Sequence, residues 1–273
     1  MHQTKRRFWI VVLLTWSLGP LLWQLYTSFS TDQALVSPLA ELEQRWTLAH
    51  YQAVLTSNPP FWRYLTNSLM VGIGSTVLTL MIATPAAYAL ARLRNRVSAI
   101  AKTLLIAAAL FPYVLLFLAL LEVARTLGLG NHLIALTIPY AALSQPLAIL
   151  LLTAAFQDLP IDLEDAARLE GLGLWQRLRW VLIPLIAPAT TSTAILVFLF
   201  CWNEYPIALT WISDSHRLTL PVAVARIAGS SVYSVPYGAY AAVTVLGSIP
   251  LIALVLIFQR SIVSGLTNGA VKG

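Results

Sequence analysis

The chain has 273 residues, of which 58% are hydrophobic and only 10% are charged, and its mean hydropathy is +0.76. These values lie outside the range of soluble globular domains and indicate a protein of the lipid bilayer. The net charge of +6 does not indicate nucleic-acid binding, because the basic residues are scattered and form no single stripe. The single cysteine, Cys201, excludes a disulfide framework and a thiolate metal site, and we predict no metal site.

Six apolar runs are each long enough to cross a hydrocarbon core about 30 Å thick, which needs roughly 20 helical residues. We therefore predict an all-α integral membrane protein, a single domain over residues 1–273 with six transmembrane helices. Prolines interrupt the second, fourth and fifth runs, and neighbouring helices must accommodate them. The predicted spans are Phe8–Phe29, Leu65–Ala91, Ile100–Ala124, Leu133–Phe156, Leu185–Leu209 and Ala239–Phe258.

Lysine and arginine residues predict the orientation of these spans, because cytoplasmic segments carry an excess of them. With both termini in the cytoplasm, most of the 17 basic residues fall on the cytoplasmic side. The cytoplasmic segments are then residues 1–7, a loop at 157–184 and a tail at 260–273, together with the link between the second and third runs. Residues 30–64 and 210–238 become external loops.

The stretch DLEDAARLEGLG, from Asp162 to Gly173, is dense in charge within an otherwise apolar chain. A charge at the membrane centre costs about 2.5 to 3.5 kcal/mol, so we place this segment in the cytoplasm. Local signals predict a helix over Leu163–Glu170, with Asp162 capping its first amides and Gly171 in the left-handed position after its end. An isolated helix this short is marginal in water, so something must hold it.

Helical spacing puts four residues on one side of this predicted helix: Leu163, Ala166, Ala167 and Glu170. The two alanines would let another surface approach the helix backbone closely, which makes this side a candidate docking face. A solvated cytoplasmic loop with one helical turn explains the spacing equally well. The following sequence LWQRLRWVLIPL predicts a second amphipathic segment that points apolar residues toward the membrane, namely Leu174, Leu178, Val181 and Leu182.

The sequence EDAARLEGLGLWQRLRWVLIPLIAP resembles the EAA loop of ATP-binding-cassette (ABC) import permeases, in which an acid and two alanines precede a glycine and a later proline. NPPFWRYLTNSLMVGIGSTVLTLMIATPAAYALARLR, FCWNEYPIALTWISDSHRLTLPV and the ending FQRSIVSGLTNGAVKG are similar to regions of the maltose-type carbohydrate permeases. The resemblance covers essentially the whole chain. It implies the type I ABC importer permease fold, a prokaryotic inner membrane and an importer of a sugar or sugar-like osmolyte, such as a di- or oligosaccharide, a glucoside or a polyol.

The resemblance also implies partners. A second permease would form a heterodimer with this chain, two ATPase subunits with bound ATP and Mg²⁺ would dock beneath, and a binding protein would deliver substrate to the external loops. The chain itself has no GxxxxGK[ST] run, and GIGST at Gly72–Thr76 lies in an apolar run without a phosphate-binding lysine. We therefore predict a transporter subunit in contact with membrane lipid, with no cofactor, no catalytic residue and no enzymatic activity of its own.

By the same resemblance, the helix Leu163–Glu170 couples to an ATPase subunit. Asp165 matches the glutamate that faces an ATPase arginine in this family, but it is one methylene shorter, and Glu164 beside it is an alternative ion-pair partner. The predicted coupling residues are Leu163, Glu164, Asp165, Ala166, Ala167, Glu170 and Gly171. The glycine-rich tail would reach between the ATPase subunits through Gly265, Asn268, Gly269, Lys272 and Gly273, with a frayed terminus as the alternative.

Polar residues near the apolar runs are candidates for the substrate pathway. Asn203 and Glu204 lie near the outer end of the fifth predicted span, where the cost of an ionisable group favours pathway lining or contact with the second permease. A boundary position in which Glu204 reaches water is the alternative. Sugars and polyols are usually held by amides, carboxylates and aromatic faces, which adds Tyr113, Gln145 and Tyr205.

A secondary transporter of a small polar solute, driven by an ion gradient, is the alternative from another class. It should show paired internal repeats with interrupted helices and a membrane-embedded carboxylate for coupling. The sequence shows no such repeat, and Glu204 alone gives it little support. A membrane-bound enzyme is also disfavoured, because the histidines at positions 2, 50, 132 and 216 are far apart in the sequence.

Overall fold

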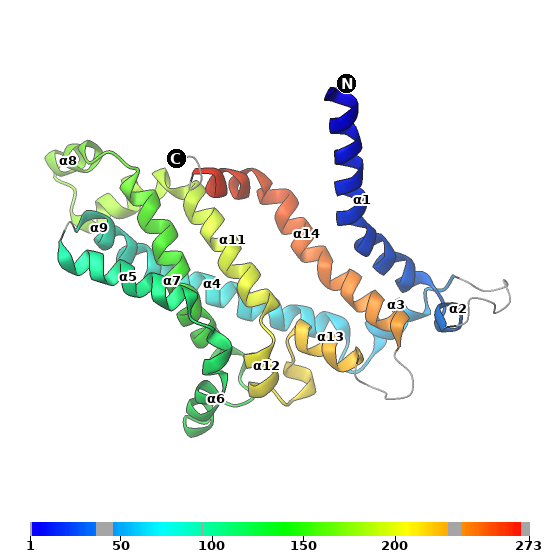
Figure 1. Ribbon diagram of the computed structural model, residues 1–273. Coiled ribbons are helices and arrows are strands. Elements are labelled where there is room, and N and C mark those ends of the chain that lie inside the picture. Colours follow the sequence, from blue (N-terminus) through cyan, green and yellow to red (C-terminus); the bar gives the residue numbers. More distant parts are fainter. Residues whose placement is uncertain (1, 37–45, 94, 229–235, 269–273) are drawn as a thin grey trace. The chain divides into compact units, whose positions relative to one another are not determined.

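The computed structural model describes residues 2–36, 46–93, 95–228 and 236–268, which are drawn as ribbons in Figure 1. Their regular structure is helical apart from one isolated antiparallel bridge between Ser30 and Trp46. The chain divides into two compact units. The first comprises Met1–Thr66 and Leu218–Leu251, and the second comprises Asn67–Arg217 and Ile252–Gly273.

The first unit contains α1 (His2–Phe29), α2 (Asp32–Val36), α3 (Ala49–Thr56), α13 (Leu220–Ala228) and the first parts of α4 (Phe61–Arg92) and α14 (Tyr237–Asn268). The second unit contains the remainder of α4 and α14 and the elements between them. These are α5 (Arg96–Leu110), η1 (Tyr113–Leu116), α6 (Phe117–Thr126), α7 (Leu133–Gln157), α8 (Asp162–Leu169), α9 (Leu174–Arg177), the π-helical turn η2 (Leu178–Leu182), α10 (Ile183–Leu185), α11 (Ala187–Asn203), α12 (Pro206–Trp211) and η3 (Ser215–Arg217).

Four of the predicted spans are present as continuous helical segments that are long and apolar enough to cross a membrane. Within the described residues these are Arg6–Phe29, Phe61–Arg92, Leu133–Gln157 and Tyr237–Gln259. Two further segments pass the same test only as bent pairs, Arg96–Leu110 with Tyr113–Thr126 and Leu174–Leu185 with Ala187–Asn203. The described residues therefore hold up to six spans, and the count of six requires each bent pair to be one span.

The third and fifth predicted spans were expected as single runs, and that expectation is wrong in both cases. The third run turns by 84° at Phe111, whose backbone is extended because proline at position 112 disfavours the helical conformation of the residue before it. The fifth begins after a bend of 80° at Ile186 and ends at Asn203, not at Leu209. A separate helix, α12, starts at Pro206, which is a favoured first residue of a helix.

In the second unit α7 packs against α5 and α11 and is linked to α4 by hydrogen bonds. Its residues Tyr140, Leu152 and Phe156 are fully buried. Small residues let the helices approach closely: a Cβ built on Gly72 of α4 would lie 2.9 Å from the ring of Phe198 in α11. α7 itself stays continuous through two internal prolines. Because α4, α5 and α11 all contact α7, the second unit is a bundle organised around this helix.

The first unit joins α1 to the elements that follow it through short polar contacts. The Ser28 and Tyr51 hydroxyls lie 2.8 Å apart, and the carboxylate of Asp32 accepts a hydrogen bond from the amide of Gly238 at 3.1 Å. The apolar length of α1 exposes large side chains, including Trp16 at 83%. Such a surface suits lipid or another membrane-spanning chain. The predicted external loops 30–64 and 210–238 contain short helices, α2, α3 and α13 among them.

Candidate functional site

The charged helix predicted over Leu163–Glu170 is present as α8, one residue earlier at each end, and lies beyond the end of α7 in the second unit (Figure 1). Its start differs from the expectation, because Asp162 lies inside the first turn and does not cap it. The residue before the helix is Ile161, whose carbonyl accepts hydrogen bonds from the amides of Glu164 and Asp165 at 2.8 and 3.1 Å. The acidic residues of this first turn instead stabilise the helix through the favourable interaction of their negative charge with the positive end of the helix dipole.

The other end of α8 is closed by a Schellman motif, as the glycine in the sequence predicted. Gly171 has a φ of +83°, a conformation that costs a residue with a side chain about 1 to 2 kcal/mol. The Leu172 amide donates to the Ala167 carbonyl at 3.1 Å, and the Gly171 amide donates to the Arg168 carbonyl at 2.9 Å. The helix therefore ends at a defined residue and the chain leaves in a fixed direction.

The expected docking face of α8 is divided in the structure. Glu164 and Ala167 are buried against the rest of the second unit, whereas Leu163, Ala166 and Glu170 are exposed. The side facing away from the body of the unit also carries Leu169, which is 90% exposed, and Asp165. Sequence spacing missed Leu169 because nothing in the local pattern shows which side of so short a helix packs inward. We define the outward face of α8 as Leu163, Asp165, Ala166, Leu169 and Glu170.

Glu164 is held by residues of α4. One carboxylate oxygen lies 2.5 Å from Arg92 Nε, and the other accepts a hydrogen bond from the Tyr88 hydroxyl at 2.9 Å. Arg92 also donates through Nη1 to the carbonyl of Phe156, at the end of α7, at 2.9 Å. Glu164 is thus paired within its own chain, which favours Asp165 as the partner in an ion pair with another protein. Arg92 was not among the predicted site residues, because 72 residues separate it from Glu164 in the sequence.

The segment after α8 packs through part of the side predicted for it. Leu178 and Leu182 are buried, whereas Leu174 is 48% exposed. Arg177 is also buried, and its Nε and Nη1 have no hydrogen-bond partner in the described part of the chain. Gln176 accepts a hydrogen bond from the amide of Gly173 at 2.8 Å and so closes the start of α9.

The predicted pathway residues do not form one cluster. Tyr113 lines a cleft of about 570 Å³ whose walls are mostly apolar and come from α5, η1, α7 and α11. Its ring meets Phe200 edge-on, with ring centres 5.4 Å apart. Leu143, Ser144 and Leu147 form the α7 side of this cleft. The cleft offers aromatic faces to a solute, and aromatic surfaces are common in ligand sites.

Three of the other predicted pathway residues lie in different surroundings. Gln145 is partly buried between α7 and α4, where its Nε2 lies 3.4 Å from the Thr79 carbonyl, and its Oε1 has no partner among the described residues. Asn203 is exposed and donates to the Leu199 carbonyl at 2.8 Å. Tyr205 is half-buried directly before α12.

Glu204 neither reaches water nor lines the cleft. It is only 2% exposed, and its carboxylate accepts hydrogen bonds from the Tyr140 hydroxyl at 2.5 Å and from the amides of Ile207 and Ala208 at 2.9 and 3.2 Å. These amides belong to the first turn of α12, so the Glu204 side chain caps that helix from the position before the N-cap residue, Tyr205. The carboxylate is thus engaged within the chain, and a role of Glu204 in the pathway stays a prediction.

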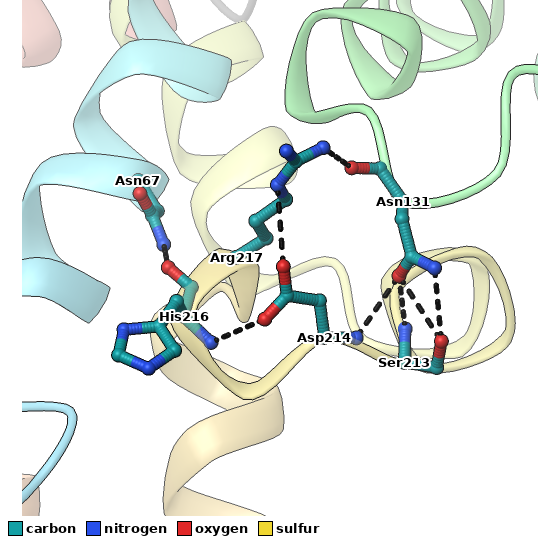
Figure 2. A network of polar contacts seen from close by, with 6 residues as sticks. All are labelled: Asn67, Asn131, Ser213, Asp214, His216 and Arg217. Atoms are coloured by element: carbon teal, nitrogen blue, oxygen red, sulfur yellow. Dashed lines mark hydrogen bonds and ion pairs between the residues drawn. The ribbon is translucent and has the colours of Figure 1, made fainter.

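A polar network near the α12 end of the second unit fixes the turn before α7 to the segment after α12 (Figure 2). Asn131 has a φ of +61°, and its side-chain oxygen accepts hydrogen bonds from the amides of Ser213 and Asp214 at 2.7 and 2.9 Å. Arg217 forms an ion pair with Asp214 at 3.3 Å. Asn67 of α4 donates a hydrogen bond to the backbone carbonyl of His216, which lies between these two residues, at 3.0 Å. Side chains of three segments, namely α4, the turn before α7 and residues 213–217, therefore link this end of the unit.

The glycine-rich tail is only partly described. Gly265 and Asn268 belong to α14, which runs without a break from the last apolar segment, whereas Gly269, Lys272 and Gly273 lie outside the described residues. The described part of the chain contains no group of three or more His, Cys, Asp or Glu side chains that could hold a metal ion.

Comparison with known proteins assigns the fold and the family. A sequence profile described as "Binding-protein-dependent transport system inner membrane component" matches residues 80–268. The chain is 39% identical to the sulfoquinovosyl glycerol transport system permease protein SmoH of Agrobacterium fabrum, over 96% of this chain and 91% of that one. It is 37% identical to the trehalose transport system permease protein SugB of Mycobacterium tuberculosis, over the whole length of both.

A solved structure shares the fold. A chain of a bacterial ABC transporter involved in the import of the acidic polysaccharide alginate superposes with a TM-score of 0.80 over 95% of each chain, at 21% identity. At that identity the likeness concerns the fold alone. The sequence profile and the two relatives carry the family, and the chain therefore belongs to the binding-protein-dependent transport system inner membrane components, the permease subunits of ABC importers.

Proposed function

We propose that this chain is a permease subunit that imports a sugar or a sugar-like osmolyte, namely a di- or oligosaccharide, a glucoside or a polyol. It would work as one half of a heterodimer with a second permease, with two ATPase subunits that bind ATP and Mg²⁺ and with an external binding protein. The similarity to permeases named for trehalose and for a sulfosugar glycerol conjugate supports this solute class.

The main observation in support of a coupling role is that contacts at both ends of α8 stabilise this short helix. Eight residues are too few for a stable isolated helix, yet α8 has a Schellman motif at one end and a buried carboxylate anchored on α4 near the other. Its outward face offers apolar surface and two acidic groups to a partner. In our proposal this face enters a cleft on an ATPase subunit and Asp165 pairs with an arginine there. The tail residues Gly265, Asn268, Gly269, Lys272 and Gly273 add a second contact with the ATPase pair.

Transport then follows from alternating access. ATP binding closes the ATPase pair, α8 moves with the subunit that holds it, and the spans reorient to open the pathway on the other side. The cleft beside Tyr113 and Phe200 is the part of the pathway that this chain would contribute, with Gln145, Asn203 and Tyr205 as further candidates. In this orientation both termini and the segment 157–184 are cytoplasmic. Residues 30–64 and 210–238 are external and receive the binding protein.

Cysteine cross-linking tests the central contact. Leu169→Cys places a thiol on the outward face of α8, and Leu127→Cys provides a matched control at an exposed leucine after α6. With a thiol-specific cross-linker, the assembled complex should give a product between Leu169→Cys and the ATPase and none from the control. Equal products from both positions, or none from Leu169→Cys, would contradict the proposed docking.

Accumulation of a panel of labelled disaccharides, glucosides and polyols, with and without this subunit, identifies the solute.

A further inference from the structure

Arg92 is the point at which three helices of the second unit meet. Its side chain belongs to the last turn of α4, pairs with Glu164 of α8 through Nε and donates to the carbonyl of Phe156 in α7 through Nη1. Tyr88, one turn earlier in α4, adds a second hydrogen bond to Glu164. We call Tyr88, Arg92, Glu164 and the Phe156 carbonyl the Arg92 junction.

The junction is enclosed, which makes it different from an ordinary surface ion pair. The Glu164 side chain is 7% exposed and that of Arg92 is 19% exposed. Exposed pairs contribute little because water replaces either partner, but removal of one member of a buried pair leaves a charge without compensation. By contrast, Asp165 and Arg168 of the same helix lie 3.9 Å apart and are both more than half exposed. The junction is therefore the polar link that resists separation of α8 from α4.

The helices joined here lead to the proposed pathway. Phe156 is near the end of α7, and three turns earlier the same helix forms one wall of the cleft through Leu143, Ser144 and Leu147. α4 is also joined to α7 by two hydrogen bonds, from Thr79 to the Ala141 carbonyl and from Thr153 to the Ala87 carbonyl, each at 3.5 Å. A displacement of α8 that acts on Glu164 is applied to both of these helices at once.

We propose that Arg92 and Glu164 are positioning residues that make α8 and the adjoining ends of α4 and α7 move as one rigid body. The inference rests on the proposed docking of α8 on an ATPase. It adds the route by which that movement reaches the cleft: from Glu164 to the guanidinium of Arg92 and from there to α7. Neither residue touches the solute or ATP. Their role is to keep transport coupled to hydrolysis.

Transport efficiency tests this role in the reconstituted importer. Arg92→Ala, Glu164→Ala and the double variant are assembled with the partner permease, the ATPase and the binding protein in proteoliposomes, and labelled solute accumulated per ATP hydrolysed is measured. We expect each single change to lower the ratio about tenfold. The double variant should fall no further than the worse single variant, because the two residues act as a unit. Arg96→Ala removes an exposed arginine four residues away and should keep the wild-type ratio.

Retention of the ATPase separates failure of the junction from failure of the docking proposal. The junction variants keep the outward face of α8, so they should still co-purify with the ATPase. Wild-type ratios in both single variants, or a double variant whose loss equals the product of the single losses, would overturn the junction while leaving the docking intact. An unaltered chain that binds no ATPase would contradict the docking itself.

A distance measurement covers the case in which a variant does not assemble, because it leaves Arg92 and Glu164 in place. Spin labels are attached at Arg168→Cys with Leu93→Cys, and at Arg168→Cys with Ser213→Cys, with the buried Cys201 replaced by serine. On trapping the ATP-bound state, the distance from 168 to 213 should change by about 5 Å and that from 168 to 93 by less than about 2 Å. Similar changes in both would overturn the junction. No change from 168 to 213 would contradict the proposed ATPase-driven movement.

Discussion

Two glutamates in the second unit, Glu164 and Glu204, are almost equally buried, with 5% and 2% of their surface exposed, but they are stabilised in different ways. Glu164 meets a cation, the guanidinium of Arg92, which lies on a helix 72 residues earlier in the sequence. Within the described part of the chain, Glu204 pairs with no cation: it accepts hydrogen bonds from Tyr140 and from two amides of the helix that follows it.

The difference shows that burial of a carboxylate does not by itself mark a transport pathway. Glu204 stabilises the short connection between α11 and α12, and its amide contacts are local. Glu164 joins a separate short helix to the long helices of the bundle. A change at Glu204 should therefore affect mainly stability, whereas a change at Glu164 should affect the relation between α8 and the rest of the unit.

The largest loss of stability is expected from Glu204→Ala. The change leaves the amides of Ile207 and Ala208 and the hydroxyl of Tyr140 without their acceptor in a buried position, at a cost of about 3 kcal/mol or more. The apparent melting temperature of the purified protein in detergent should fall accordingly. A melting temperature equal to that of the unaltered protein would show that the cap contributes nothing.

Glu164→Ala should cost less stability, about 2 kcal/mol, because Arg92 keeps its bond to Phe156 and part of its access to solvent. The same melting experiment measures it, with Asp165→Ala as the matched control on the exposed side of α8. The control should lie within about 0.5 kcal/mol of the unaltered protein. A greater loss from Asp165→Ala than from Glu164→Ala would reverse the inward and outward faces described above.

Gly171→Ala should weaken the end of α8 by about 1 kcal/mol, because alanine at a φ of +83° is strained although nothing obstructs its methyl group. The effect is local, so it is best measured by hydrogen exchange of the α8 amides, which should be about fivefold faster. Gly173→Ala is the control, since its backbone is extended with a φ of −67°. Unchanged exchange in the Gly171 variant would argue against the Schellman motif.

The smallest effect is expected from Arg168→Ala. This residue pairs with Asp165 at 3.9 Å on the exposed side of the helix, where such pairs contribute at most about 0.5 kcal/mol. Stability measured in low and high salt should be the same within error for the variant and the unaltered chain. A clear salt-dependent loss would mean that the outward face of α8 is more organised than its exposure indicates.

Much of the fold can be predicted from the sequence, because apolar runs and the residues that end helices are visible in contiguous stretches of the chain. The spans that became α1, α4, α7 and α14 were found in this way, and so was the glycine that ends α8. The two bent pairs show where run length is insufficient. Phe111 before a proline signals the break in the first pair. Pro206 marks a different boundary, the start of α12 after α11 ends at Asn203, and it does not account for the bend at Ile186.

The candidate site was less predictable, because its decisive contacts join residues far apart in the chain. Nothing near Glu164 in sequence indicates that it turns inward to Arg92, or that Leu169 is left outside. The cap made by Glu204 is closer to the sequence, since an acidic residue two positions before a proline at a helix start can accept from the first amides. Its location in an apolar run favours a pathway residue instead.

The most direct test compares one substitution at both glutamates. Glu164→Gln and Glu204→Gln are reconstituted in the full importer, and solute accumulated per ATP hydrolysed is measured for each. The account predicts a fall of about tenfold for Glu164→Gln with the ATPase still bound, and a wild-type ratio for Glu204→Gln even where less protein survives purification. Wild-type ratios in both variants, or equal losses in both, would contradict it.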